Sequence, residues 1–131
     1  MSRILLDTHL LLWAVAEPRK LPPGVRKRIE GAEVFVSAAS LWEVSIKAAL
    51  GKLAADPAEV LAEVESAGFT LLPITGEHAA AVARLPAVHA DPFDRMLVAQ
   101  ARTEPLLLLT NDSVLAGYGD CVELVAAKPR R

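Results

Sequence analysis

The chain has 131 residues, the size of one ordinary globular domain, so we expect a single domain over residues 1–131. Its hydrophobic content of 53% suffices for a buried core, but no apolar run approaches the roughly 20 residues of a membrane span, and no secretion signal is recognisable. The net charge of −2 does not indicate a nucleic-acid-binding surface, and the lone Cys121 excludes an internal disulfide, so we expect a cytoplasmic protein without membrane contact.

Short apolar segments alternate with helical patterns along the whole chain. We expect strands at residues 3–6, 34–36, 69–72, 106–109 and 122–125. The helices between them are expected to begin near Thr8, Pro22, Ser37, Asp56, Thr75 and Asp91, where capping side chains or prolines suit the first turn. A further short helix is expected at residues 113–115. Gly31, Gly51 and Gly68 are expected to end helices.

Continuous apolar strands that alternate with helices are typical of a parallel sheet covered on both faces. We therefore predict an α/β fold, a single three-layer α/β/α sandwich with a mostly parallel five-stranded sheet. In open sheets of this kind, ligands bind beyond the C-terminal ends of the strands. Asp7 follows the first strand and Asp112 lies just beyond the fourth, so both are expected at that edge.

Two of the acidic candidates for a site there have ordinary structural explanations as well. Asp7 could cap the following helix, although Thr8 could do so instead and leave Asp7 free. Glu43 stands four residues before Lys47, the favourable order for a solvent-exposed helical ion pair. The helix that carries Glu43 is apolar around most of its circumference, however, so a carboxylate on it requires another reason.

Two more acidic candidates follow later in the chain. Asp94 could complement a helix dipole, but Asp91 before a proline is the more natural cap, which makes Asp94 the better ligand. Arg95 beside it could pair with a carboxylate or bind a phosphate. Asp112 could belong to a turn. Gathering four carboxylates costs several kcal/mol unless a cation neutralises them, and a hard divalent ion is the simplest explanation.

The segments around these acids resemble the PIN-domain nucleases, most closely the VapC-type toxins of bacterial toxin–antitoxin pairs. The similar stretches are DTHLLLW, SAASLWEVSIKAALGKL, HADPFDRMLVAQA and LLLLTNDSVL, in this order over essentially the full length. The resemblance implies that the catalytic and Mg²⁺- or Mn²⁺-binding residues are Asp7, Glu43, Asp94 and Asp112. It also implies that the side chains of Thr8, Ser40 and Asn111 orient these carboxylates.

The implied activity is that of a metal-dependent endoribonuclease that hydrolyses RNA phosphodiester bonds to 5′-phosphate and 3′-hydroxyl ends. The resemblance further implies a homodimer and a cognate VapB-like antitoxin whose C-terminal segment enters the active-site groove. Leu41, Trp42 and Leu53 could serve those contacts or could be core residues. The basic segment 19–28 could contact RNA or could be a solvated helix face.

Other classes of function fit the sequence less well. A phosphatase of the haloacid-dehalogenase type needs a second Asp two positions after Asp7, where His9 stands, and no Gly-rich GK[ST] loop is present. Zinc is disfavoured because His9, His78 and His89 show no ligand spacing. The serious alternative is a non-catalytic PIN-fold binding module that acts through a protein partner, but the presence of all four acids gives it little support.

Overall fold

The computed structural model describes residues 2–125. The strands are β1 (Ser2–Leu6), β2 (Ala32–Ser37), β3 (Thr70–Leu72), β4 (Leu107–Thr110) and β5 (Val122–Leu124). The α-helices are α1 (Thr8–Ala16), α2 (Val25–Glu30), α3 (Ala38–Ala49), α4 (Pro57–Ser66), α5 (Gly76–Ala81) and α6 (Pro92–Thr103), with 3₁₀ helices η1 (Pro18–Lys20), η2 (Val82–Arg84) and η3 (Leu115–Tyr118). None of these helices is both long and apolar enough to cross a membrane.

All strands of the described sheet run parallel, in the spatial order β3-β2-β1-β4-β5. The central strand β1 pairs with β2, where Ile4 lies opposite Val34, and with β4, where Leu5 lies opposite Leu108. The predicted α/β fold is therefore confirmed. The strand order reverses at β1 and β4, and such a switch point leaves a crevice beyond the C-terminal ends of both strands.

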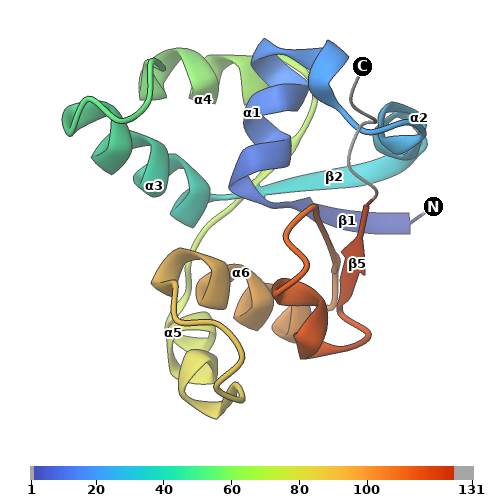
Figure 1. Cartoon of the computed structure of the whole chain (residues 1–131), viewed down its shortest axis with the longest axis vertical. Coiled ribbons are helices and arrows are strands. Elements are labelled where there is room, and N and C mark those ends of the chain that lie inside the picture. The colour runs from blue at the N-terminus through green and yellow to red at the C-terminus, as the bar shows by residue number, and fades with distance from the viewer. Residues whose placement is uncertain (1, 126–131) are drawn as a thin grey trace.

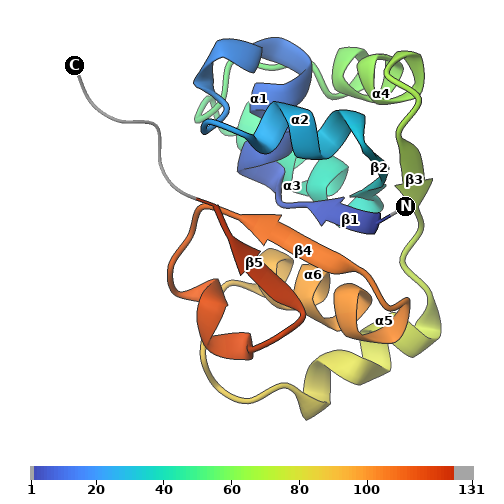
Figure 2. The same cartoon turned by 90° about the vertical axis from the view of Figure 1, so that its right-hand side faces the viewer.

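Helices cover both faces of this sheet (Figures 1 and 2). Figure 2 shows α1, α2 and α4 on one side of the sheet and α5 and α6 on the other. Side chains of β1 alternate between two apolar clusters: Ile4 and Leu6 belong to one and Leu5 to the other, all fully buried. Burial of each such side chain stabilises the fold by about 1.5–3 kcal/mol. The strand ends are thus held by a packed core.

The local capping chemistry follows the sequence closely. The predicted caps Ser37, Asp56, Thr75 and Asp91 each accept a hydrogen bond from a backbone N–H of the helix that follows. Two predictions were wrong in detail. α2 begins at Val25 rather than at the prolines, since Gly24 with φ +83° precedes it. The short helix expected at residues 113–115 is the 3₁₀ helix η3, which starts two residues later.

Candidate active site

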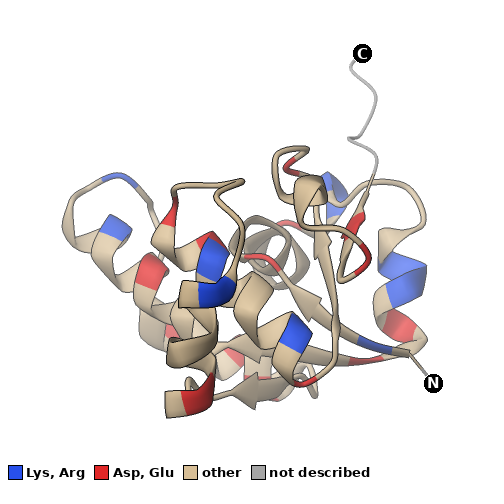
Figure 3. Ribbon diagram, turned by 90° about the horizontal axis from the view of Figure 1, so that it is seen from below, with Lys and Arg blue, Asp and Glu red and all other residues tan. Residues whose placement is uncertain are grey.

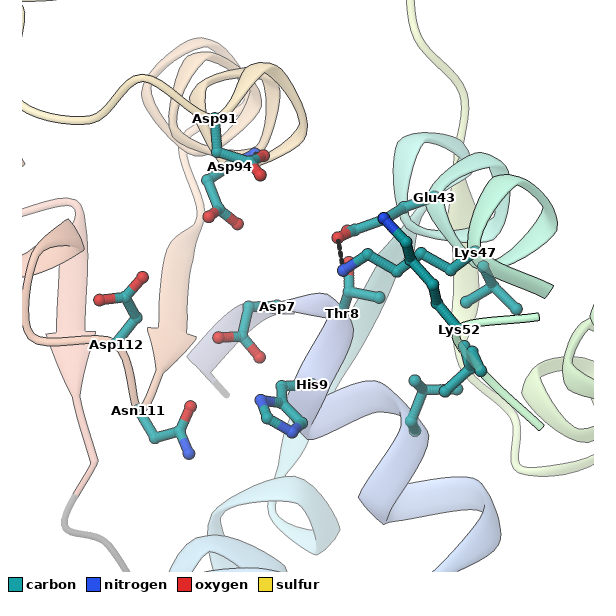
Figure 4. Close-up of a pocket in the computed structure, with 13 residues that line it drawn as sticks. Asp7, Thr8, His9, Glu43, Lys47, Lys52, Asp91, Asp94, Asn111 and Asp112 are labelled. Carbon is teal, nitrogen blue, oxygen red and sulfur yellow. Dashed lines mark hydrogen bonds and ion pairs between the residues drawn. The ribbon is translucent and has the colours of Figure 1, made fainter. Parts of the chain in front are cut away.

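A cleft of about 330 Å³ opens at the C-terminal edge of the sheet, beyond β1 and β4 (Figure 4). Helices α1, α3 and α6 and the segment after β4 contribute its lining. The polar lining residues are Asp7, Thr8, His9, Glu43, Lys47, Lys52, Asp91, Asp94, Asn111 and Asp112. All four acids chosen from the sequence line this one cleft, and so do Thr8 and Asn111. Their roles as ligands and orienting groups remain predictions.

Asp7 is fixed by both of its carboxylate oxygens. Oδ1 accepts a hydrogen bond from Leu10 N–H at 2.8 Å, and Oδ2 accepts one from the Thr110 hydroxyl at 2.5 Å. Asp7 therefore caps α1 itself. The expectation that Thr8 caps was wrong, because Thr8 is already the first helical residue and its hydroxyl donates to Ser40 Oγ at 2.9 Å. Burial raises the pKa of Asp7, and the two hydrogen bonds oppose that rise.

Glu43 forms the predicted helical ion pair, but its own carboxylate is buried while Lys47 is half exposed. Its Oε2 lies 2.7 Å from Lys47 Nζ, yet the residue is only 6% exposed. The other oxygen, Oε1, is buried and has no hydrogen-bond partner. A buried acceptor without a partner costs about 1–3 kcal/mol. Glu43 is thus positioned for an additional cation or donor that the polypeptide around it does not supply.

Asp94 lies at the third position of α6, as the sequence predicts, and its N–H donates to the cap Asp91 at 3.0 Å. Burial raises the pKa of Asp94 to about 7, and the carboxylates of Asp91, Glu43 and Asp7 add to this rise. His89 is the neighbour that lowers it. The ionised form of Asp94 is therefore disfavoured first by burial and then by the neighbouring carboxylates, and a cation placed beside it would offset both effects.

His89 is a site residue that the sequence analysis missed. Its Nε2 lies 3.3 Å from Asp94 Oδ2 and 3.2 Å from Asp112 Oδ2, close enough for these three residues to share an ion. Its Nδ1, however, accepts the N–H of Asp91 at 3.1 Å, so Nε2 carries the proton. A metal-bound imidazole ordinarily donates from its other nitrogen. In this orientation His89 therefore donates to Asp112 and lies beside Asp94, rather than acting as a ligand.

Thr110, the last residue of β4, was missed as well. Its fully buried hydroxyl donates to Asp7 Oδ2 and accepts the N–H of Asp112 at 3.0 Å. Asp112 in turn accepts the N–H of Val114 at 2.9 Å, so its turn-forming role is real and uses only Oδ1. The Thr110 hydroxyl thereby connects Asp7, which follows β1, with Asp112, which follows β4. The signal available in the sequence was a polar residue at the end of an otherwise apolar strand.

Arg95 lies outside the acidic cleft. Its guanidinium donates to the carbonyls of Val82 at 3.0 Å, Pro86 at 3.2 Å and His89 at 3.4 Å, and to the Tyr118 hydroxyl at 3.3 Å. None of these described partners is a carboxylate, so of the two roles considered for Arg95 the structure does not show the carboxylate pairing. Arg95 instead ties the loop between η2 and α6 to α6. This loop carries His89, which links the arginine to the site only indirectly.

Replacing Arg95 by Lys should therefore destabilise the protein rather than change its substrate contacts. One ammonium cannot serve carbonyls that a planar guanidinium reaches together, and we expect a loss of about 1–3 kcal/mol in unfolding free energy. Urea unfolding measures this, with the exposed Arg84→Lys as the matched control. Unchanged stability together with lost RNA binding would instead place Arg95 in the substrate site.

The basic segment 19–28, for which RNA contact and a solvated helix face were both open, reaches the opposite edge of the sheet. Lys27 and Arg28 border a hollow with Ser2, where β1 begins, whereas the acidic cleft lies where β1 ends. Arg28 is also ion-paired with Glu123. Figure 3 shows the basic residues of α2 and those at the C-terminal end of α3 on opposite sides of the molecule. The Lys and Arg side chains that line the cleft are Lys47 and Lys52.

Comparison with known proteins agrees with this architecture. The family model described as PIN domain matches residues 4–120, whereas no curated protein matches the chain. The DNA-bound VapBC from Salmonella typhimurium is 22% identical with a TM-score of 0.69, over 94% of this chain and 98% of that one. VapBC2 from Rickettsia felis, bound to a promoter DNA fragment, is 13% identical with a TM-score of 0.66, over 95% and 99%. FitAcB from Neisseria gonorrhoeae is 25% identical with a TM-score of 0.53, over 86% and 89%.

Proposed function

The chain belongs to the PIN domain family, and from this premise we propose that it is a metal-dependent endoribonuclease acting as a VapC-type toxin. Proteins with this domain are generally nucleases. The proposal adds RNA as the substrate, Mg²⁺ or Mn²⁺ as the cofactor and a protein antitoxin as the partner. It takes residues 1–131 as one functional domain and the cytoplasm as its place of action.

The observation that carries the proposal is the uncompensated acidity of the cleft. Glu43 Oε1 is buried without a partner, and the pKa of Asp94 is about 7. Both features are costly in the protein alone and are relieved by a divalent cation. The donor set consists of carboxylate oxygens, which suit the hard ions Mg²⁺ and Mn²⁺. We propose that Asp7, Glu43, Asp94 and Asp112 hold the ion and form the catalytic set.

The chain's own groups prepare this site. When bound, a divalent ion would acidify a water molecule and stabilise charge on the leaving oxygen. Leu10 N–H and the Thr110 hydroxyl hold the Asp7 carboxylate in one orientation. The Thr8 hydroxyl donates to Ser40 and is not a free nucleophile. Water is accordingly the nucleophile that we propose, with products that carry 5′-phosphate and 3′-hydroxyl ends.

The proposed partners follow from the shared fold. The Salmonella and Rickettsia structures are VapBC assemblies bound to DNA, and we propose a VapB-like antitoxin and a homodimer for this chain. Trp42 is 60% exposed and contacts Phe93 edge-on at 5.3 Å, so it offers an apolar surface where α3 meets α6. Leu41 and Leu53 instead pack against the core.

RNA cleavage by purified, antitoxin-free protein tests the proposal. Cleavage of a panel of structured RNAs should require Mn²⁺ or Mg²⁺, stop in EDTA and leave 5′-phosphate ends. The variant Asp120→Asn, which removes an exposed acid that does not line the cleft, should cleave normally. Cleavage that persists in EDTA would overturn the metal dependence. Intact RNA together with no Mn²⁺ binding would favour the non-catalytic binding module.

A further inference from the structure

The cleft is divided between an acidic and a basic side. Figure 4 shows Asp7, Asp94 and Asp112 grouped on one side, while Lys47 and Lys52 reach in from the other. No arginine joins these lysines among the described residues that line the cleft. A phosphodiester backbone approaching five lining carboxylates is repelled unless cations offset them. The lysine side is therefore where the chain itself can accommodate the negative charge of a substrate.

The way α3 ends places both lysines at the cleft. Lys52 N–H donates to the Lys47 carbonyl at 2.9 Å, and Gly51 N–H donates to the Ala48 carbonyl at 3.1 Å. This pair of hydrogen bonds is a Schellman turn, and Gly51 has the left-handed φ of +72° that such a turn favours in glycine. The turn reverses the chain directly after α3. The two ammonium groups thus belong to one local structure that faces the acids.

The two lysines are in different states. Lys52 is exposed and has no ion-pair partner within residues 2–125. Lys47 is paired with Glu43, its Nζ lying 2.7 Å from Oε2. A divalent ion bound at the unpartnered Oε1 would repel the Lys47 ammonium and draw on the charge of the same carboxylate, which weakens the ion pair at Oε2. Lys52 can thus contact a phosphate in the metal-free protein. Lys47 can do so only after a cation binds Glu43 and weakens their ion pair.

We propose that Lys47 and Lys52 are substrate-positioning residues that bind backbone phosphates of the RNA, and that cation binding at Glu43 releases Lys47 for this contact. The inference rests on the proposed function. An ammonium group binds a phosphate as a point charge and carries no base specificity. The lysines therefore set the affinity and the placement of RNA in the cleft, and sequence selection comes from elsewhere.

Binding of a fluorescein-labelled single-stranded RNA in EDTA, followed by fluorescence anisotropy, tests Lys52. Lys52→Met should weaken binding about 3- to 10-fold at 0.1 M salt and should reduce the slope of log K against log salt by about 0.7. Lys27→Met is the matched control, since it removes the same charge at the opposite edge of the sheet. Equal effects of the two variants, or an effect of Lys27→Met alone, would overturn the inference.

Lys47 is tested by two effects of opposite sign. Lys47→Met removes a competitor for Glu43, so Mn²⁺ binding followed by electron paramagnetic resonance should tighten about 3- to 10-fold. The KM for RNA cleavage in Mn²⁺ should rise in the same variant. If Lys47 had a merely structural role, its replacement would weaken Mn²⁺ binding as well as raise the KM for RNA, and that outcome would overturn the inference. Wild-type protein that neither binds nor cleaves RNA would overturn the proposed function as well, whereas normal wild-type activity with unaffected lysine variants would overturn only this inference.

Discussion

Asp94→Asn should abolish RNA cleavage while stabilising the metal-free protein. The amide keeps the shape of the carboxyl, so its oxygen can take the place of Oδ2, which lies 3.3 Å from His89 Nε2. It cannot supply the negative charge that we propose for cation binding. We expect a loss of at least about 10²–10³-fold in kcat/KM, the scale for removing one charge-stabilising group from an active site. Single-turnover cleavage in Mn²⁺ measures this loss.

The stability gain has a definite pH dependence. The pKa of Asp94 is raised from 3.8 to about 7 in the folded protein, so the folded state retains a proton that the unfolded chain has released. Stability of the metal-free wild type should therefore fall as the pH rises from about 4 through about 7. Asp94→Asn should lack this contribution and should be more stable than the wild type at pH 8, by on the order of 2–4 kcal/mol.

Urea unfolding in EDTA at pH 5 and pH 8 measures this difference, with Asp120→Asn as the control for removing an exposed acid. Addition of Mn²⁺ should then stabilise the wild type and not the Asp94→Asn variant, because only a native state that binds the ion gains from it. If the wild type and the Asp94→Asn variant lose the same unfolding free energy between pH 5 and pH 8, ionisation of Asp94 does not cause that loss.

Local chemistry explains why much of the fold and the acidic set could be predicted from the sequence. Ser37 and Asp91 cap the helices that follow them because an oxygen beside a free N–H suffices, whatever the rest of the chain does. The apolar strands are equally local signals. The spatial order of the strands is not, because it depends on pairing between segments far apart, such as Leu6 with Leu109.

The unpredicted parts of the site are long-range contacts. His89 meets Asp112 across 23 positions, and Thr110 meets Asp7 across 103, so spacing along the chain carries no trace of either. Arg95 illustrates the converse: a charge beside a candidate ligand in sequence suggested a role in the site, but its side chain donates to carbonyls such as that of Val82. Chain proximity predicts caps well and side-chain direction poorly.

The difference between closeness along the chain and closeness in the fold also explains where the basic residues lie. The cluster at positions 26–28 was conspicuous because its charges are consecutive, yet α2 carries it to the edge of the sheet where β1 begins. Lys47 and Lys52 are separated in sequence; Lys47 was considered only as the partner of an exposed ion pair, and Lys52 was not singled out. A turn at Gly51 and the burial of Glu43 bring them to the cleft. Charge density along a sequence is therefore a weak guide to which charged residues line a cleft.

Thr110→Val should show what the hydroxyl between the two central strands contributes. Valine matches threonine in shape, so the change removes the donor to Asp7 Oδ2 and the acceptor for Asp112 N–H without opening a cavity. The pKa of Asp7 should rise further, because the Thr110 hydrogen bond lowers it. We expect a loss of about 1–3 kcal/mol in unfolding free energy and about 10- to 100-fold weaker Mn²⁺ binding.

The Mn²⁺ dependence of cleavage separates a site role of Thr110 from a purely structural one. If the hydroxyl orients Asp7 and Asp112, Thr110→Val should require about 10- to 100-fold more Mn²⁺ for half-maximal cleavage and should recover much of its rate at saturation. Thr70→Val, which removes an exposed hydroxyl from the edge strand β3, should change stability by no more than about 0.5 kcal/mol and leave the Mn²⁺ requirement unchanged. Lost stability in Thr110→Val with an unchanged Mn²⁺ requirement would mean that the hydroxyl holds the strands together and does not prepare the acids.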